Sequence, residues 1–254
     1  MSTVDINADL GESFGAYTLG HDAEIMRCVT SANVACGFHA GDPVVMERTV
    51  SLAKAAGVAV GAHPGYPDLQ GFGRRKLAMS AHELQAAVVY QLGALRAFLE
   101  AQGLRMQHVK LHGALYNLAA ADEALSLEIC QAIRAVDPGL AFYGLAGSAI
   151  LRAAEQAGLQ PVSEVFADRA YNEDGTLVSR SLPGAVLHDP ALVAQRVISM
   201  VREGTVCTIT GKTIRLRADS ICVHGDNADA VALAQRIRQA LEREGIVLRA
   251  PGRA

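Results

Sequence analysis

The sequence lacks the features that mark membrane, secreted and nucleic-acid-binding proteins. No apolar run reaches the ~18 residues needed to cross a bilayer. The N-terminus has no basic segment followed by an apolar one, so no signal peptide is predicted. No basic run stands out, and a net charge of −3 with a pI near 6.2 argues against nucleic acid as a partner. These absences predict a cytoplasmic protein that contacts neither membrane nor nucleic acid.

Paired cysteines are absent as well. The chain has five cysteines, an odd number, and none of them forms a CxxC pair; they are Cys28, Cys36, Cys130, Cys207 and Cys222. This scattered pattern is typical of reduced thiols, which again favours a cytoplasmic setting.

Strand-like and helix-like patterns alternate along the chain. Short apolar runs ending in polar or glycine-rich loops predict seven strands, at 4–8, 31–36, 58–62, 108–111, 140–143, 162–165 and 221–223. Helices are expected at 21–30, 43–56, 80–102, 121–136, 148–157, 189–203 and 228–244. Regular alternation of this kind predicts an α/β fold with a parallel sheet. A closed, seven-stranded parallel (β/α) barrel is the predicted architecture, and an open doubly wound sheet is the alternative.

No repeat, low-complexity tract or linker divides the chain, so residues 1–254 are expected to form a single barrel domain. A β-hairpin is expected at 206–217, turning at Gly211-Lys212. The tip resembles the end of a phosphate-binding loop, but the first glycine of that motif is missing because position 206 is Val. No motif therefore predicts a nucleotide site.

The opening stretch, residues 5–15, concentrates polar residues in and after the first predicted strand. Asp5, Asn7 and Asp9 are two residues apart, so their side chains share one face of the strand. Glu12 follows in a turn between two glycines. Buried polar rows are costly unless they are hydrogen-bonded or functional. The stretch fits acid–base chemistry, a metal or ammonium recognition, and the alternative is a hydrogen-bonded strand end that holds the next loop.

Polar residues also gather where the other predicted strands end. In parallel α/β folds, sites form at this end of the strands. One histidine after a strand is usually structural, whereas four on one rim predict a working site. The residues at the strand ends are Asp9 and Glu12, His39 and Asp42, His63 and Asp68, Lys110 and His112, Glu164 with Asp168 and Arg169, and His224 and Asp226.

Each group admits more than one role. Asp9, His39 and His63, together with His112, are the candidate ligands for a divalent metal, and the alternative is that the histidines handle protons. No HxH or HExxH spacing supports the metal. Lys110 is expected to neutralise a carboxylate or a developing oxyanion, or else to pair with an aspartate across the barrel mouth. Arg74 lies in a glycine-flanked loop, where anion binding and a solvated surface role are both open.

Several stretches together resemble the LamB/YcsF family. The matching segments are DINADLGESFG (5–15), SANVACGFHAGDP (31–43), GAHPGYPD (61–68), GFGRR (71–75), VKLHGALYN (109–117), EVFADRAYNEDGTLVSR (164–180) and CVHGDN (222–227). They cover nearly the whole chain in family order. The sequence departs at Leu111, where the family usually has proline, and only local backbone slack is expected from this change.

The resemblance implies a seven-stranded β/α barrel related to the glycoside hydrolase and polysaccharide deacetylase barrels. It also implies a reaction in which 5-oxo-L-proline, ATP and water give L-glutamate, ADP and phosphate. ATP is then a co-substrate. Family members act with two further 5-oxoprolinase subunits, B and C, so this chain is expected to be an incomplete enzyme by itself.

Roles within the site are assigned from side-chain chemistry, because the family name does not supply them. The residues expected in catalysis are Asp9, Glu12, His39, His63, Lys110 and His112. Those expected to bind substrate are Asn7, Arg74, Asp168, Arg169, His224 and Asp226. Two other functions stay open at this point: a metal-dependent, deacetylase-like hydrolase that needs no ATP, and a non-catalytic subunit that presents substrate to its partners. Association of copies of the chain is also left open.

Overall fold

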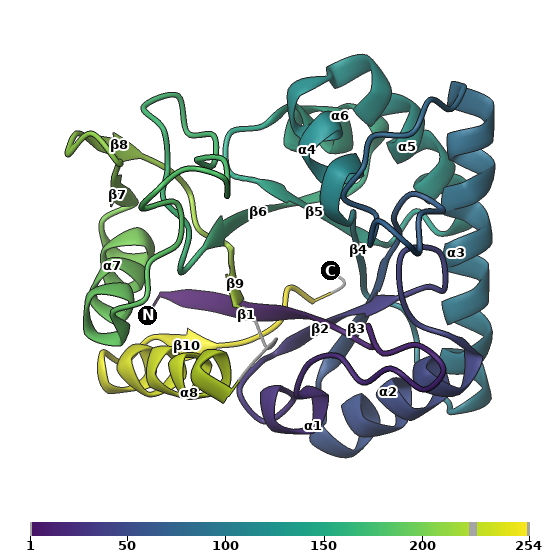
Figure 1. The fold of residues 1–254 in the computed structure, drawn as a ribbon, viewed down its shortest axis with the longest axis horizontal. Helices are drawn as coiled ribbons and strands as arrows, with labels where there is room; N and C mark the ends of the chain where they lie inside the picture. The colour runs from purple at the N-terminus through teal and green to yellow at the C-terminus, as the bar shows by residue number, and fades with distance from the viewer. Residues whose placement is uncertain (1, 224–227, 253–254) are drawn as a thin grey trace.

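Seven parallel strands close into a barrel in the computed structural model, which describes residues 2–223 and 228–252. In Figure 1 the ring of strands is seen end on, with helices around it. The strands are β1 (Thr3–Leu10), β2 (Ser31–Ala35), β3 (Ala59–His63), β4 (His108–Lys110), β5 (Ala141–Leu145), β6 (Gln160–Phe166) and β9 (Ser220–Val223). Because β1 pairs with both β2 and β9, the sheet has no open edge within this ring. The predicted closed barrel is confirmed, and the open-sheet alternative is wrong.

Helices cover the outside of the ring, and their ends follow local sequence signals. They are α1 (Asp22–Ile25), α2 (Pro43–Ala56), α3 (Ala81–Ala101), α4 (Gly113–Ala121), α5 (Glu123–Val136), α6 (Ala149–Ala157), α7 (Pro190–Arg202) and α8 (Ala228–Arg243). The side chain of Asp42 accepts from the first amides of α2, as its position before Pro43 predicts. Ser80 and Glu83 form the predicted capping box of α3.

Three details differ from the sequence prediction. The helix expected at 21–30 is only the four-residue α1. The helix expected at 121–136 is preceded by a separate helix, α4, and Asp122 ends α4 while its side chain caps α5. A two-residue strand, β10 (Val247–Leu248), pairs with the beginning of β1 and was not expected. The predicted hairpin is confirmed, since β7 (Thr205–Cys207) and β8 (Thr213–Arg215) pair antiparallel.

Strand β1 divides the apolar core from a polar barrel interior. Its even-numbered residues, Val4 to Leu10, are buried in the hydrophobic core. Its odd-numbered polar residues contact strands across the barrel: Asp5 accepts from the Tyr143 hydroxyl of β5 and Asn7 donates to Glu164 of β6. The predicted polar face of this strand is confirmed. None of the helices within residues 2–223 and 228–252 has the length and apolar character that a bilayer crossing requires.

Candidate active site

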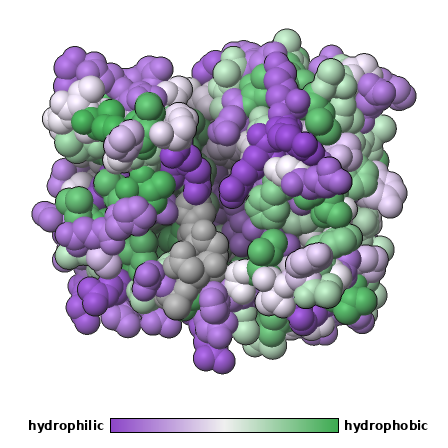
Figure 2. Space-filling view, viewed as in Figure 1, coloured by the Kyte–Doolittle hydropathy of each residue, from purple (hydrophilic) through white to green (hydrophobic). Residues whose placement is uncertain are grey.

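A cavity of about 960 Å³ lies at the carboxyl ends of the barrel strands. Its lining includes a residue at or just after the end of β1, β3, β4, β5, β6 and β9. Figure 2, in the same view as Figure 1, shows the surface hollowed near its middle beside strongly hydrophilic residues. The volume is at the upper end of the roughly 300–1,000 Å³ that is usual for ligand pockets. The cavity is therefore the candidate site.

Lys110, the last residue of β4, is a buried cation on this cavity. Its Nζ lies 3.0 Å from Asp9 Oδ1 and 2.8 Å from Glu164 Oε1, and only 3 % of its side chain is exposed. Burial alone would lower the pKa of Lys110, but the adjacent carboxylates outweigh burial and hold the pKa well above its ordinary value. The lysine stays protonated and compensates two carboxylates with one charge.

Asp9 presents its carboxylate to the cavity, with a quarter of its side chain exposed. Oδ1 accepts from Lys110 and, at 2.8 Å, from the amide of Asn33, while Oδ2 lies 3.3 Å from His63 Nε2. Burial would raise the pKa of Asp9, but the charges of His63 and Lys110 outweigh it and hold the pKa well below its ordinary value. Asp9 is therefore ionised and fixed in orientation.

Asn33 and His108 support Asp9, and neither was predicted as a site residue. His108 Nε2 lies 2.7 Å from Asn33 Oδ1, and because burial and the Lys110 charge lower the pKa of His108 to about 3, its ring is neutral and donates this bond. Gly61 faces the His108 ring so closely that a Cβ there would overlap it. Spacing by two residues is the sequence pattern that could have identified both. Asn33 lies two residues after Ser31, and His108 lies two residues before Lys110, so each pair shares one face of its strand.

The ring nitrogens of His63 and His112 that face each other are 3.0 Å apart. A carbonyl oxygen can only accept, so His63 Nδ1, 2.8 Å from the carbonyl of Lys110, and His112 Nε2, 2.8 Å from the carbonyl of Phe72, are both donors. In the neutral rings the facing nitrogens would both carry lone pairs. A shared proton or a cation must lie between them. Burial lowers the pKa of His112 to about 3, and Asp9 Oδ2 lies 3.3 Å from His63 Nε2, one of the two facing nitrogens.

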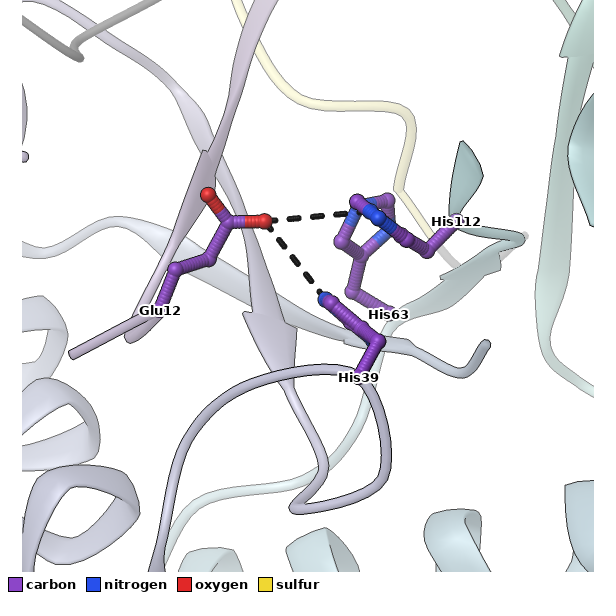
Figure 3. Close-up of side chains that lie close together, drawn as sticks. All are labelled: Glu12, His39, His63 and His112. Carbon is purple, nitrogen blue, oxygen red and sulfur yellow. Dashed lines mark hydrogen bonds and ion pairs between the residues drawn. The ribbon is translucent and has the colours of Figure 1, made fainter. Parts of the chain in front are cut away.

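Glu12 and His39 complete a cluster with this histidine pair (Figure 3). Glu12 Oε1 lies 3.5 Å from His39 Nε2 and 3.7 Å from His112 Nδ1. Burial and the charge of Asp9 raise the pKa of Glu12, and burial holds the pKa of His39 well below its ordinary value. Within the described ranges, neither ring nitrogen of His39 has a hydrogen-bond partner. One ligand atom from each of these four residues lies within 4.8 Å of the others, a set suited to a divalent cation.

Glu164 and Cys222 lie behind Lys110; the sequence placed Glu164 among the strand-end residues without an individual role, and Cys222 was not predicted there. Glu164 is fully buried, accepts from Tyr116 at 2.7 Å and accepts from Asn7 at 3.0 Å. Cys222 Sγ lies 3.2 Å from Lys110 Nζ, and burial holds the pKa of its thiol well above the ordinary value. These residues fix the lysine from the side away from the cavity.

The other predicted site residues are spread around the cavity. Arg74 and Arg169 line it, and Arg169 donates to the carbonyls of two loop residues. Asn7 and His39 are fully buried, but each contacts a residue that lines the cavity. Asn7 accepts from Lys110 Nζ at 3.2 Å, and His39 Nε2 lies 3.5 Å from Glu12 Oε1. Asp168 is not among the described cavity-lining residues. His224 and Asp226 lie outside the described residues.

Fold and site together define a parallel β/α-barrel protein with an acid–base site at the carboxyl ends of its strands. The chain belongs to the LamB/YcsF family, whose model matches residues 4–254, so the resemblance found in the sequence is confirmed.

Named relatives agree with this assignment. The chain is 56 % identical to the 5-oxoprolinase A subunit of Campylobacter jejuni, over 97 % of the chain and 96 % of that protein. It is 58 % identical to the 5-oxoprolinase A subunit of Thermococcus onnurineus, over 96 % and 95 %. The crystal structure of a lactam utilization protein from Thermus thermophilus matches with a TM-score of 0.94 at 49 % identity, covering 98 % of this chain and all of that one.

Proposed function

We propose that this chain is the A subunit of an ATP-dependent 5-oxoprolinase, which opens the lactam ring of 5-oxo-L-proline to give L-glutamate. The observation that carries the proposal is the likeness to 5-oxoprolinase A subunits over nearly the full length of both chains. The site agrees chemically, because it combines an ionised carboxylate, a carboxyl group with a raised pKa and a histidine pair on one cavity.

ATP is needed because a lactam is a stabilised amide with a poor leaving group. Phosphorylation of the lactam oxygen by ATP releases ADP and makes the ring carbon attackable. Water then adds to this carbon and the C–N bond breaks, which leaves an acyl phosphate of glutamate. A second water hydrolyses this acyl phosphate and releases phosphate. The balance is 5-oxo-L-proline, ATP and two water molecules giving L-glutamate, ADP and phosphate.

Two proton transfers accompany the hydrolysis, and we assign them to residues on the cavity. Glu12 takes the proton from the attacking water, because its raised pKa makes it a better base than the strongly acidic Asp9. The pair of His63 and His112 supplies the proton to the leaving nitrogen, from the facing ring nitrogens that are 3.0 Å apart. Asp9 lies beside this pair, 3.3 Å from His63 Nε2, and Lys110 holds Asp9 in place.

Subunits B and C are proposed as partners, since the relatives are named as subunits of a larger enzyme. The test is release of ADP with 5-oxo-L-proline, measured for this chain alone and with its B and C partners co-expressed. Release that requires the lactam and all three proteins is expected. No release in either condition, with the partners shown to be folded, would overturn the proposal. Binding of the lactam without turnover would favour a substrate-presenting role instead.

A second candidate is metal-dependent hydrolysis without ATP, and the cluster of Glu12, His39, His63 and His112 favours it. The residues fit a divalent cation, because His63 and His112 each donate their other ring nitrogen to a carbonyl, as metal-bound histidines do. A bound cation would polarise a carbonyl oxygen or acidify a water. Metal analysis of the purified protein, with a lactam and amide hydrolysis assay lacking ATP, separates the two candidates.

A further inference from the structure

We propose that the N-terminus of α6, with the hydroxyl of Ser148, binds the phosphate groups of ATP. The identity of the nucleotide rests on the proposed function, whereas the phosphate chemistry rests on the structure alone. No nucleotide-binding motif marks this place in the sequence.

The first observation is a buried hydroxyl that lacks a partner. Ser148 is the residue before α6 and is 8 % exposed, yet its side chain makes no capping hydrogen bond. Ser148 Oγ has no hydrogen-bond partner among residues 2–223 and 228–252. A buried polar atom of this kind calls for an explanation, since most such atoms are satisfied. A ligand oxygen in the cavity that Ser148 lines would satisfy it.

The second observation is the backbone around this serine. Gly147 has a φ of +77°, and the space where its Cβ would lie is open. The first amides of a helix have no carbonyl partner within the helix and carry the positive end of its dipole. Residues 145–149 line the same cavity as Asp9 and His63. An anion bound at α6 therefore shares one enclosure with the acid–base groups.

Cationic side chains that line the cavity add positive charge to that of the α6 dipole. Arg152 donates to the carbonyl of Gly147 at 3.3 Å and pairs with Glu123, while 58 % of its side chain stays exposed. Arg169 and Arg180 also line the cavity, and the charge of Arg180 adds to burial in lowering the pKa of Arg169. Neighbouring guanidinium groups of like charge are stabilised by a bound polyanion. The cavity volume of about 960 Å³ leaves room for substrate beside a nucleotide.

The test is calorimetric titration of AMP-PNP, a non-hydrolysable ATP analogue, into the chain alone and into its complex with subunits B and C. Ser148→Asp keeps a residue favoured at helix N-termini but places a negative charge against the phosphates. Ser148→Ala removes only the hydroxyl. Arg152→Gln removes one cation, and Arg96→Gln is its matched control, because Arg96 also pairs with one glutamate, is half exposed and lies outside the cavity.

We expect Ser148→Asp and Arg152→Gln to raise the dissociation constant at least about tenfold, and Ser148→Ala to raise it about fivefold. Arg96→Gln should leave the constant unchanged. Binding that is equally tight in all variants, or no binding of AMP-PNP to wild type even in the complex, would overturn the proposal. If only the oxoprolinase assignment were wrong, the nucleotide would still bind at α6, but ADP release would not depend on the lactam.

Discussion

The Nζ atom of Lys110 lies 2.8 Å from Oε1 of Glu164, and neither side chain reaches solvent to more than 3 %. Glu164 lies on β6 and Lys110 on β4, so the pair spans the barrel interior. Its carboxylate is also held by Tyr116 and Asn7. A buried pair of this kind fixes the position of the lysine that orients Asp9.

Lys110→Met should destabilise the fold by about 3–5 kcal/mol, because it leaves Glu164 buried without its cation. Urea unfolding measures this loss. The double variant Lys110→Met with Glu164→Gln should recover part of the stability, since the uncompensated charge is gone, but not the turnover. If the single and double variants were equally stable, the uncompensated charge of Glu164 would not be the cause of the lost stability.

Gly61→Ala should displace the His108 side chain, because the added methyl group would overlap its ring. We expect a loss of about 1–3 kcal/mol in the free energy of unfolding from overpacking. We also expect kcat to fall by up to about 100-fold, the effect of moving an active-site group by about 1 Å. Gly93→Ala is the control, since Gly93 lies on α3 with open space around it and should gain about 0.5–1 kcal/mol. A normal kcat in Gly61→Ala would show that His108 and Asn33 are not needed to position Asp9.

His112→Asn should lower kcat by about 10²–10⁴-fold, the usual contribution of a positioned acid–base group. The fold should persist, because only the ring that faces His63 is changed. His82→Asn, on the exposed side of α3, is the matched control and should leave kcat unchanged. Steady-state kinetics of the three-subunit enzyme measures both. A His112→Asn enzyme with full kcat would exclude the histidine pair from proton transfer.

The ion pair of Asp68 and Arg75 predicts a pH dependence of stability. The hydrogen bond from Arg75 lowers the pKa of Asp68 to about 2, below its ordinary value of 3.8. A carboxylate with a lowered pKa in the folded state stabilises the fold above its unfolded pKa, and this contribution is lost as the pH falls through the folded pKa. Thermal melts of wild type and Asp68→Asn should therefore differ at pH 6 and converge between pH 4 and pH 2. A constant difference across this range would contradict the assignment.

The strands could be predicted because each is a short apolar run with a polar or glycine-rich end, as at residues 58–62 and β3. The division between α4 and α5 was missed because one residue, Asp122, both ends the first helix and caps the second within a continuous helical pattern. Strand β10 has only two residues, too few to show a strand pattern. Its pairing with β1 is long-range and cannot be read from the local sequence.

Within the site, the residues at strand ends could be predicted, because the barrel brings these ends together. Those that line the cavity are Asp9, Glu12, His63, Lys110, His112 and Arg169.

The supporting residues could not be predicted in the same way. Asn33 and His108 lie within strands, where a polar residue is ordinarily explained by internal hydrogen bonding. Glu164 was recognised as a strand-end residue, but its pairing with Lys110 was not. The connection of these residues to Asp9 depends on which strands face each other across the ring, and single-strand spacing does not contain that information. The unpartnered hydroxyl of Ser148 is likewise visible only once its neighbours are placed.

We propose that this chain performs chemistry and does not merely present substrate. The most direct test is glutamate formation by the complex with subunits B and C, comparing wild type with Asp9→Asn, and with Asp174→Asn as a control on the same cavity. Asp9→Asn keeps the oxygen that accepts from Lys110 and Asn33 but removes the charge beside His63. We predict a fall in glutamate formation of about 10²–10⁴-fold with unchanged unfolding, and no fall for Asp174→Asn. Wild-type glutamate formation by Asp9→Asn would contradict the account.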